Sequence, residues 1–271
     1  MMPNYFECGR FRFDLRTAHS KPLVMGVLNA TPDSFSDGGR YQSIDLAISH
    51  AEQMIADGVD IIDIGGESSR PGAAPLALDE ELARVMPLIY ALRDCGKAIS
   101  IDTYKPEVMR EAIIAGVDMV NDIRGFSDPA SRSVIAGSDV AVCVMHMQNH
   151  PENMQQQPSY VEVVREVQAF LSARCEDLFA AGVDQSRICV DPGFGFGKTL
   201  EHNLHLLRHL AALGEQLQLP VLAGLSRKNM IGVLTGKPVE KRMAGSVAAA
   251  LAAVQQGAKL VRVHDVAETV D

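Results

Sequence analysis

The feature that most constrains the fold is a short glycine-centred motif that recurs along the chain. Its copies lie at residues 57–60, 115–118, 181–184 and 256–259, with a looser copy at 95–98. Each follows a helical pattern and precedes a short apolar run. Glycine directly after a helix adopts the left-handed conformation at little cost and closes the last turn. A short loop from there into a strand is typical of βαβ units, so helix and strand should alternate.

The expected strands are short, continuous apolar runs rich in Val, Ile, Leu and Met. They are Leu23–Leu28, Ile61–Ile64, Ala98–Ile101, Met119–Val120, Val140–Met145, Ile188–Val190, Val221–Ala223 and Leu260–Val263. Such runs suit strands covered on both faces, as in a parallel sheet. Between them, the spacing of apolar residues over 82–92 predicts one helix face. The other expected helices are Ser43–Asp57, Pro129–Ala136, Tyr160–Ala181, Glu201–Leu217 and Ala244–Gln256.

Polar residues close to the ends of these runs distinguish two possible folds. They are Asn29, Asp63, Asp102, Asn121, His146, Asp191, Ser226 and His264. A doubly wound open sheet uses few strand ends, whereas a barrel brings every strand end to one face. We therefore predict a single α/β domain over residues 1–271, folded as a (β/α)8 TIM barrel. Residues 5–14 alternate around Cys8 and Gly9 and predict an N-terminal β-hairpin that covers the N-terminal mouth of the barrel.

Composition and charge exclude several classes of protein. The chain is 47% hydrophobic and 22% charged, which is typical of a globular protein, and its net charge of −9 disfavours a nucleic-acid partner. No apolar run is long enough to span a bilayer, so no membrane partner is expected, and no signal peptide is indicated. The five cysteines are scattered without a C-x-x-C pair, which predicts a reduced, cytoplasmic protein without a zinc ribbon.

Four polar, glycine-rich segments follow the expected strands, at residues 29–39, 65–72, 191–198 and 226–228. The first two are long enough to act as lids. The third fails as a phosphate loop, because Pro192 and Lys198 occupy positions where the Walker A and Rossmann motifs require glycine. We interpret it as a turn that lets backbone approach a ligand beside Asp191.

Cations and a neutral oxygen ligand are expected at the same mouth. Arg262 and His264 are one pleat apart on the last strand, so both should face an anion there, although a structural Arg and a packed His are the alternative. Arg70 and Lys228 add positive charge. Asn29 suits a Mg²⁺ ion that is held mainly by ligand phosphates and water.

Asp102, Asn121 and Asp191 form a group of the opposite kind. Buried carboxylates and amides need partners, and a planar heterocycle with an N–H edge would supply them. An internal Asp–Lys or Asp–Arg network, with Lys228 as the partner, is the alternative. Zinc and serine-hydrolase chemistry are disfavoured, because the chain contains neither H-E-x-x-H nor G-x-S-x-G.

The segments at 25–38, 65–72, 100–103, 121–122, 191–198, 226–228 and 262–264 together resemble the dihydropteroate synthase family, in the family's order and over essentially the whole chain. The resemblance implies a homodimeric barrel of folate biosynthesis that requires Mg²⁺. It would join p-aminobenzoate to 6-hydroxymethyl-7,8-dihydropterin diphosphate, giving 7,8-dihydropteroate and pyrophosphate. Sulfonamides, which mimic p-aminobenzoate, are implied as inhibitors.

Carried over to this chain, the resemblance implies a set of site residues without a single catalytic base. The pterin pocket would be Asp102, Asn121, Asp191 and Lys228. The diphosphate contacts would be Ser69, Arg262 and His264. The p-aminobenzoate side would be Phe35, Arg70, Pro71, Phe196 and Ser226, and the Mg²⁺ ligand would be Asn29.

Two departures from the family and three rival functions remain at this point. Position 69 is Ser where the family usually has Thr, and family members usually continue through an eighth helix beyond the position of Asp271. The rivals are a pterin-binding methyltransferase barrel, an aldolase with Lys228 as a Schiff-base lysine, and a non-catalytic pterin-binding protein.

Overall fold

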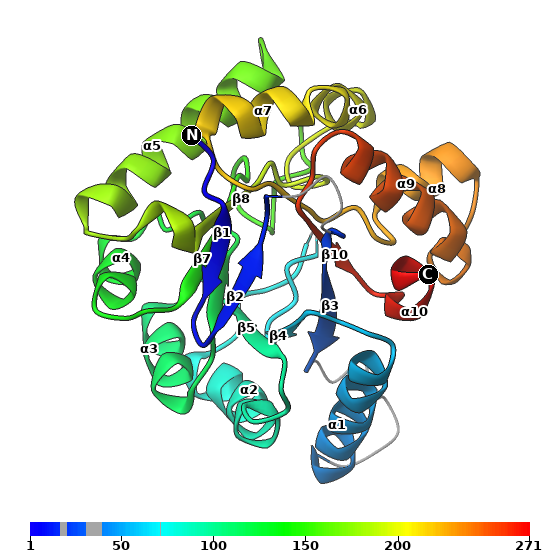
Figure 1. Ribbon diagram of the computed structural model, residues 1–271. Coiled ribbons are helices and arrows are strands. Elements are labelled where there is room, and N and C mark those ends of the chain that lie inside the picture. Colours follow the sequence, from blue (N-terminus) through cyan, green and yellow to red (C-terminus); the bar gives the residue numbers. More distant parts are fainter. Residues whose placement is uncertain (17–20, 31–39, 71) are drawn as a thin grey trace.

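Eight parallel strands form the central sheet of the protein (Figure 1). A computed structural model describes residues 1–16, 21–30, 40–70 and 72–271. The strands are β3 (Leu23–Asn29), β4 (Ile61–Gly65), β5 (Ala98–Asp102), β6 (Met119–Asp122), β7 (Ala141–Met145), β8 (Ile188–Asp191), β9 (Leu222–Ala223) and β10 (Leu260–Val263). They pair in the order β8-β7-β6-β5-β4-β3-β10-β9, and a single bridge between Val190 and Val221 brings β8 beside β9. The predicted barrel is confirmed, and the open sheet is wrong.

Helices surround this sheet on its outer face. They are α1 (Arg40–Ala56), α2 (Leu78–Leu92), α3 (Pro106–Ala115), α4 (Pro129–Ala136), α5 (Val163–Ala180), α6 (Leu200–Arg208), α7 (Leu210–Leu217), α8 (Asn229–Thr235), α9 (Met243–Gln255) and α10 (Val266–Val270), with 3-10 turns η2 (Gln185–Arg187) and η3 (Val239–Lys241). The five glycines of the recurring motif have φ between +78° and +104°, which confirms their turn role. No helix in the described ranges is long and apolar enough to cross a membrane.

Several helix boundaries differ from the expected ones by one to three residues, such as the start of α1 at Arg40 instead of Ser43, and two differences have a local cause. The single helix expected over 201–217 is divided into α6 and α7 at His209, whose φ of −109° and ψ of 15° are not helical. The helix expected from Tyr160 begins at Val163 instead, because the Tyr160 hydroxyl stays in the preceding loop and donates to the Gly197 carbonyl at 2.9 Å. The short helices α8 and α10 were not indicated by the apolar spacing, since neither is long enough to repeat it.

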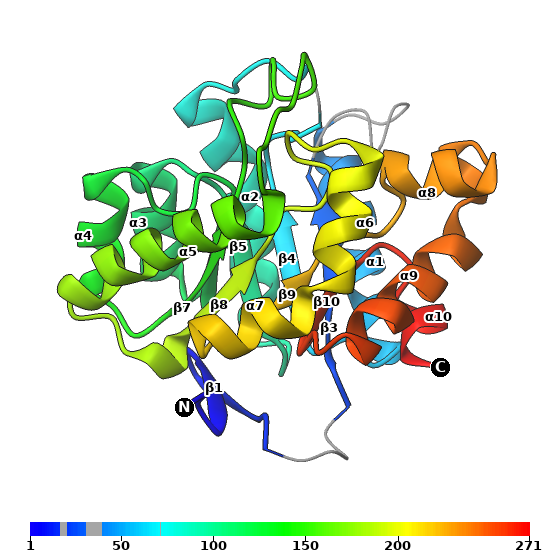
Figure 2. The same ribbon diagram turned by 90° about the horizontal axis from the view of Figure 1, so that it is seen from above.

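The N-terminal end of the barrel is filled by apolar side chains from every strand of the ring. They are Met25, Ile61, Ala98, Met119, Ala141, Cys143, Cys189, Leu222 and Leu260. The predicted hairpin is present as β1 (Tyr5–Cys8) and β2 (Phe11–Asp14), and it lies across this end (Figure 2). Its Phe6 and Cys8 side chains are fully buried against the cluster. The hairpin therefore closes this mouth, and ligand chemistry is left to the other end.

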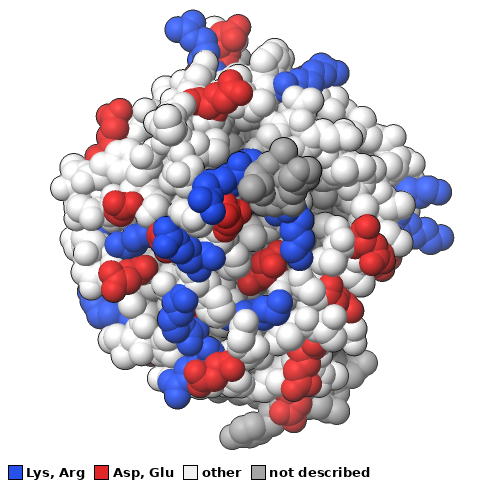
Figure 3. Space-filling view, in the orientation of Figure 1, with Lys and Arg blue, Asp and Glu red and all other residues white. Residues whose placement is uncertain are grey.

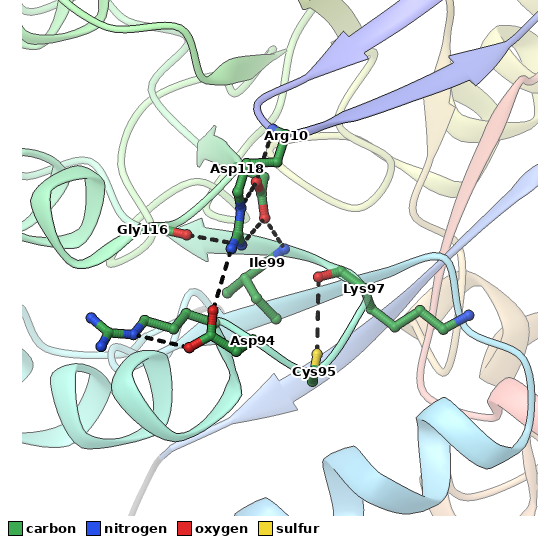
Figure 4. A network of polar contacts seen from close by, with 8 residues as sticks. Arg10, Asp94, Cys95, Lys97, Ile99, Gly116 and Asp118 are labelled. Atoms are coloured by element: carbon green, nitrogen blue, oxygen red, sulfur yellow. Dashed lines mark hydrogen bonds and ion pairs between the residues drawn. The ribbon is translucent and has the colours of Figure 1, made fainter.

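A buried carboxylate fastens the hairpin turn to the barrel (Figure 4). Asp118 accepts hydrogen bonds from the Arg10 backbone N–H at 3.1 Å, from Arg10 Nε at 2.8 Å and Nη2 at 2.9 Å, and from the Ile99 N–H at 3.0 Å. Gly9 has φ +55°, and a Cβ there would lie 2.7 Å from the Asp118 Cα, so only glycine fits this turn. The surface around the hairpin mixes charges of both signs, without a large patch of either (Figure 3).

Candidate active site

The carboxyl ends of four adjacent strands place polar side chains in one row. Asn29 on β3 is in register with Gly65 on β4, Gly65 with Asp102 on β5, and Asp102 with Asn121 on β6. A Cβ at Gly65 would lie 3.9 Å from Asn29 Oδ1 and 3.7 Å from the Asp102 Cβ. Gly65 therefore lies directly between the expected metal ligand and the first residue of the expected pterin pocket.

A partly buried arginine, Arg262, joins two carboxylates just inside this row. Arg262 Nε donates to Asp63 Oδ2 at 2.6 Å, and its Nη2 donates to Asp102 Oδ2 at 2.8 Å. Asn121 Nδ2 also donates to Asp63 Oδ2, at 3.1 Å. The internal Asp–Arg network weighed as an alternative is therefore present, with Arg262 rather than Lys228 as the partner.

Asp63 is the residue of this network that the sequence did not assign to the site. It is fully buried, and its Oδ1 atom has no hydrogen-bond partner in the part of the chain that the structure describes. An acidic residue inside the apolar run of β4 was the available signal, because such a side chain must find a partner inside the barrel.

Loss of hydration is the largest single influence on the pKa values of Asp102 and Arg262 in this cluster. It raises the pKa of Asp102 to about 7, against the attraction of Arg262. It also opposes the charged form of Arg262, but the facing carboxylates Asp63 and Asp102 outweigh it and raise the pKa of that guanidinium. Arg262 is therefore a permanent cation, whereas Asp102 titrates near neutral pH.

Asp191 and Lys228 are two groups of opposite charge that lie beside the Arg262 network. Asp191 Oδ1 accepts from the Gly193 N–H at 2.7 Å, and Lys228 Nζ donates to the Phe194 carbonyl and lies 4.6 Å from the centre of the Phe196 ring. Loss of hydration lowers the pKa of Lys228 to about 8 and raises that of Asp191. Within the described residues, no ion pair within 4 Å joins Lys228 to a carboxylate.

Gly224, just after β9, lies between Asp191, Lys228 and Arg262, and distances from it show how close these residues are to one another. A Cβ on this glycine would lie 3.6 Å from Asp191 Oδ2, 3.7 Å from Lys228 Nζ and 3.8 Å from the Arg262 Cβ. Residues from three strand ends thus converge on one point of the barrel mouth.

His264 and Ser226 line the same mouth as a hydrogen-bonded pair. Ser226 Oγ accepts from the His264 backbone N–H at 3.2 Å and lies 3.0 Å from His264 Nδ1. Burial lowers the pKa of His264 to about 4, and the neighbouring Arg262 and Arg227 act in the same direction. The sequence grouped His264 with the cations, but the ring is neutral near pH 7, because hydration is lost and cations surround it.

The loop over 67–76 carries two more of the expected residues above this mouth. Glu67 fastens both ends of the loop, because its carboxylate accepts from the Tyr104 hydroxyl at 2.9 Å and from the Leu76 N–H at 3.1 Å. Between these ends, Ser69 is half-buried and Arg70 is exposed. The expected residues Phe35 and Pro71 lie outside the described residues.

A buried lysine, Lys198, holds the glycine-rich loop after β8. Lys198 Nζ donates to the carbonyls of Gly193 at 2.9 Å and Phe196 at 3.0 Å, and it lies 2.9 Å from His146 Nδ1. Burial and Lys198 lower the pKa of His146 to about 2, so the ring is neutral and can accept a hydrogen bond from Lys198 Nζ, whose own pKa burial lowers well below its ordinary value. Gly193 has φ +69°, and a Cβ there would lie 1.8 Å from the His146 carbonyl oxygen. This tight packing fixes the segment that carries Phe196.

The residues present fit a cation that takes most of its ligands from a substrate. No group of three or more His, Cys, Asp or Glu side chains that could hold a metal occurs in the ranges described. The half-buried Asn29 amide has no hydrogen-bond partner within those ranges, and its Oδ1 lies 3.9 Å from the position of a Cβ on Gly65. One neutral oxygen that no other described side chain uses is a donor that suits Mg²⁺ held mainly by phosphate and water.

A (β/α)8 barrel with converging carboxylates, amides and cations at its carboxyl mouth is the architecture of an enzyme that acts on small molecules. Residues 25–264 match the family described as pterin binding enzyme, and the chain belongs to this family. A dihydropteroate synthase of Neisseria meningitidis serogroup C is 48% identical over 275 residues, which cover all of this chain and 96% of the relative.

Two solved structures of this kind share the fold closely. The dihydropteroate synthase of Burkholderia cenocepacia, solved in complex with 7,8-dihydropteroate, has a TM-score of 0.89 and 49% identity, covering all of this chain and 94% of its own. That of Yersinia pestis, solved with a sulfonamide drug complex, has a TM-score of 0.91 and 45% identity, covering 98% of this chain and 95% of its own.

Proposed function

We propose that the protein catalyses the dihydropteroate synthase reaction of folate biosynthesis. It is a transferase that joins p-aminobenzoate to 6-hydroxymethyl-7,8-dihydropterin diphosphate and releases pyrophosphate. The proposal rests on the convergence at Gly224, where an acidic acceptor, Asp191 Oδ2, a cation, Lys228 Nζ, and the Cβ from which the Arg262 side chain starts lie within 4 Å of one point. A polar bicyclic ring with an anionic tail needs both kinds of group at one mouth.

The pterin half of the substrate would be read by oxygens that the protein leaves uncommitted. Asn121 uses its Nδ2 on Asp63, so its amide oxygen can accept from a ring N–H. Asp191 uses its Oδ1 on the Gly193 N–H, so its Oδ2 can do the same. Each charge-assisted hydrogen bond of this kind contributes about 1.5–3 kcal/mol to binding.

Departure of the diphosphate would be the main chemical barrier. The methylene that is attacked is attached to the dihydropterin ring, which can delocalise the positive charge that develops there. Arg262 and Arg70 stabilise the negative charge of the leaving diphosphate, and neutral His264 donates a hydrogen bond to it. A rate that depends steeply on nucleophile basicity among substituted anilines, with chemistry limiting, would contradict this dissociative course.

The arylamine is a weak nucleophile that needs positioning more than a strong base. The Phe196 ring, held by the loop after β8, and the 67–76 loop with Arg70 would orient p-aminobenzoate toward the methylene. Competition at this position is the reason to expect inhibition by sulfonamides, and the sulfonamide complex of the Yersinia pestis relative supports it.

Mg²⁺ is the cofactor that this mouth would hold through the Asn29 amide oxygen. When bound, the ion neutralises charge on the diphosphate, whose oxygens and water supply its other ligands. Asn29→Ala should raise the Mg²⁺ concentration needed for half-maximal rate, measured against a chelator series, and should leave the melting temperature unchanged.

A homodimer in the cytoplasm is the assembly and location that we propose. Several large apolar side chains are exposed on the neighbouring elements α8, η3 and α9: Val233, Leu234, Val239, Met243 and Leu251. Exposed large apolar side chains on neighbouring elements are the kind of surface that a second copy of the chain would cover, and Leu251→Glu should shift the mass in light scattering from dimer to monomer. All five cysteines are free, as a reducing compartment requires.

Pyrophosphate formation with both substrates, measured with and without p-aminobenzoate, tests the reaction. We expect release that depends on the arylamine. A methyltransferase barrel would form no pyrophosphate, and a non-catalytic binder would saturate with pterin without turnover. An aldolase would be trapped at Lys228 by borohydride with a carbonyl substrate.

A further inference from the structure

The connection from β7 to α5 contains a compact loop at the site mouth, residues 148–159, which we call the Ω-loop. Gln148 Nε2 donates to the Ser159 carbonyl at 2.8 Å, and the Ser159 N–H donates to Gln148 Oε1 at 3.1 Å, so one side chain closes the base. Pro151 and Met154 are buried within it. A closed base and an internal apolar filling are the features of an Ω-loop that holds its shape.

One side of the Ω-loop contacts the loop that carries Ser69 and Arg70. The Gly72 N–H donates to the Pro151 carbonyl at 3.0 Å. Figure 2 shows the two connections rising side by side at the end of the barrel opposite the hairpin. The Ω-loop thus gives the 67–76 loop a docking point two residues after Arg70.

Its other side contacts the glycine-rich loop on both sides of Phe196. Gln155 Nε2 donates to the Gly195 carbonyl at 2.5 Å, and Tyr160, just beyond the Ω-loop, donates to the Gly197 carbonyl at 2.9 Å. The Gly195 carbonyl belongs to the peptide that leads into Phe196. Gln155 therefore holds the carbonyl that precedes Phe196, and Lys198 holds the carbonyl of Phe196 itself.

We propose that Gln155 is a positioning residue for the arylamine substrate, acting through Phe196 and together with the Pro151 docking point. The two segments that the Ω-loop contacts carry Arg70 and Phe196, two of the residues expected on the p-aminobenzoate side. In the part of the chain described, no hydrogen bond from the Ω-loop reaches Asp102, Asn121 or Lys228 of the pterin pocket. This inference rests on the proposed function and assigns a residue that the sequence patterns did not indicate.

Gln155→Ala should raise the KM for p-aminobenzoate about three- to tenfold, as expected for one lost hydrogen bond. The KM for the pterin diphosphate and kcat should stay within about twofold, because no other contact is removed. Gln155→Glu keeps the size of the side chain but removes the donor, so it should raise the same KM at least as much. Initial rates of pyrophosphate release, with each substrate varied while the other saturates, measure all three quantities.

The matched control is Gln156→Ala. Gln156 is also exposed, and its side chain makes no hydrogen bond to any described residue, so all three kinetic quantities should remain at wild-type values. Gln155 is exposed too, so neither variant should change the melting temperature.

Three results would overturn the inference: an unchanged KM for p-aminobenzoate in Gln155→Ala, an equal rise in Gln156→Ala, or an equal rise in the KM for the pterin diphosphate. Each of these requires an active wild-type protein. A wild-type protein that releases no pyrophosphate would instead contradict the proposed function, and the inference with it.

Discussion

The two ends of the barrel interior are built from the same strands but follow opposite rules. On β4, Ile61 lies in the apolar cluster under the hairpin, and Asp63, one pleat further, binds Arg262. On β6, Met119 and Asn121 are related in the same way. A strand alternates its faces, so residues two apart enter the same interior, and the chain changes from apolar to polar within one step.

The comparison shows which end of the barrel serves stability and which end serves function. At the hairpin end, the buried carboxylate of Asp118 receives four hydrogen bonds. At the other end, Asp63 Oδ1 has no partner among described residues, and the pKa values of Asp102 and Lys228 are displaced toward neutrality. Incompletely satisfied groups with displaced pKa values are typical of a site that waits for a ligand.

Of the substitutions considered, replacement of Arg262 should lower the free energy of unfolding most. A small change would contradict the comparison between the two ends of the barrel. Arg262→Met leaves Asp63 and Asp102 buried without their common cation, so the free energy of unfolding should fall by about 3–5 kcal/mol. Turnover should also be lost. Urea unfolding at pH 8 and pH 5 measures this, and the loss should be smaller at pH 5, below the raised pKa of Asp102. A loss under 1 kcal/mol at both pH values would contradict the structural role.

Asp118→Ala should act on stability alone. It leaves the buried Ile99 N–H and part of Arg10 without an acceptor, so the free energy of unfolding should fall by about 1–3 kcal/mol. The site lies at the opposite end, so kcat/KM should remain at the wild-type value at a temperature where the variant is folded. A fall in kcat/KM there would show that the two ends are not independent.

The pH dependence of kcat/KM for the pterin diphosphate tests the displaced pKa values at the polar end of the barrel. Asp102 must be ionised to accept from a ring N–H, and Lys228 must be protonated to act as a cation. With pKa values of about 7 and about 8, kcat/KM for the pterin diphosphate should fall about tenfold per unit below the first and above the second. Any activity left in Asp102→Asn should lose the acid limb. A profile that stays flat from pH 5 to pH 9 would contradict the assignment.

Ser69→Thr should give the smallest effect. The hydroxyl is kept, and the added methyl restricts the side chain to fewer rotamers. We expect the KM for the pterin diphosphate to fall by no more than about twofold, with stability unchanged. Steady-state kinetics decides this, and a tenfold change in either direction would show that the methyl has a contact of its own.

Most of the fold could be predicted because its signals are local. The recurring glycine marks the return into a strand, and the strands are apolar on both faces, so both features can be read within a few residues. The break between α6 and α7 could not be predicted, since the apolar spacing continues through His209 without a Pro or Gly. The helices α8 and α10 are too short to produce a period.

The site could be predicted where a residue type alone carries the chemistry. Polar strand ends such as Asp102 and Asn121 were found in this way. The partner of Arg262 could not be found, because Asp63 is 199 residues away in sequence and meets it only across the barrel. The neutral state of His264 depends on burial and on Arg262 and Arg227, and the contact of Gln155 depends on a loop without periodicity.

The central claim is that the polar mouth reads a pterin ring while the hairpin end only holds the barrel together. Calorimetric titration of the pterin diphosphate into Asp191→Asn tests it most directly, because the amide can still accept from the Gly193 N–H and the fold should survive. We predict an unchanged melting temperature and an affinity at least about tenfold weaker, as expected when a charge-assisted acceptor becomes a partial donor. Wild-type affinity in this variant would contradict the account.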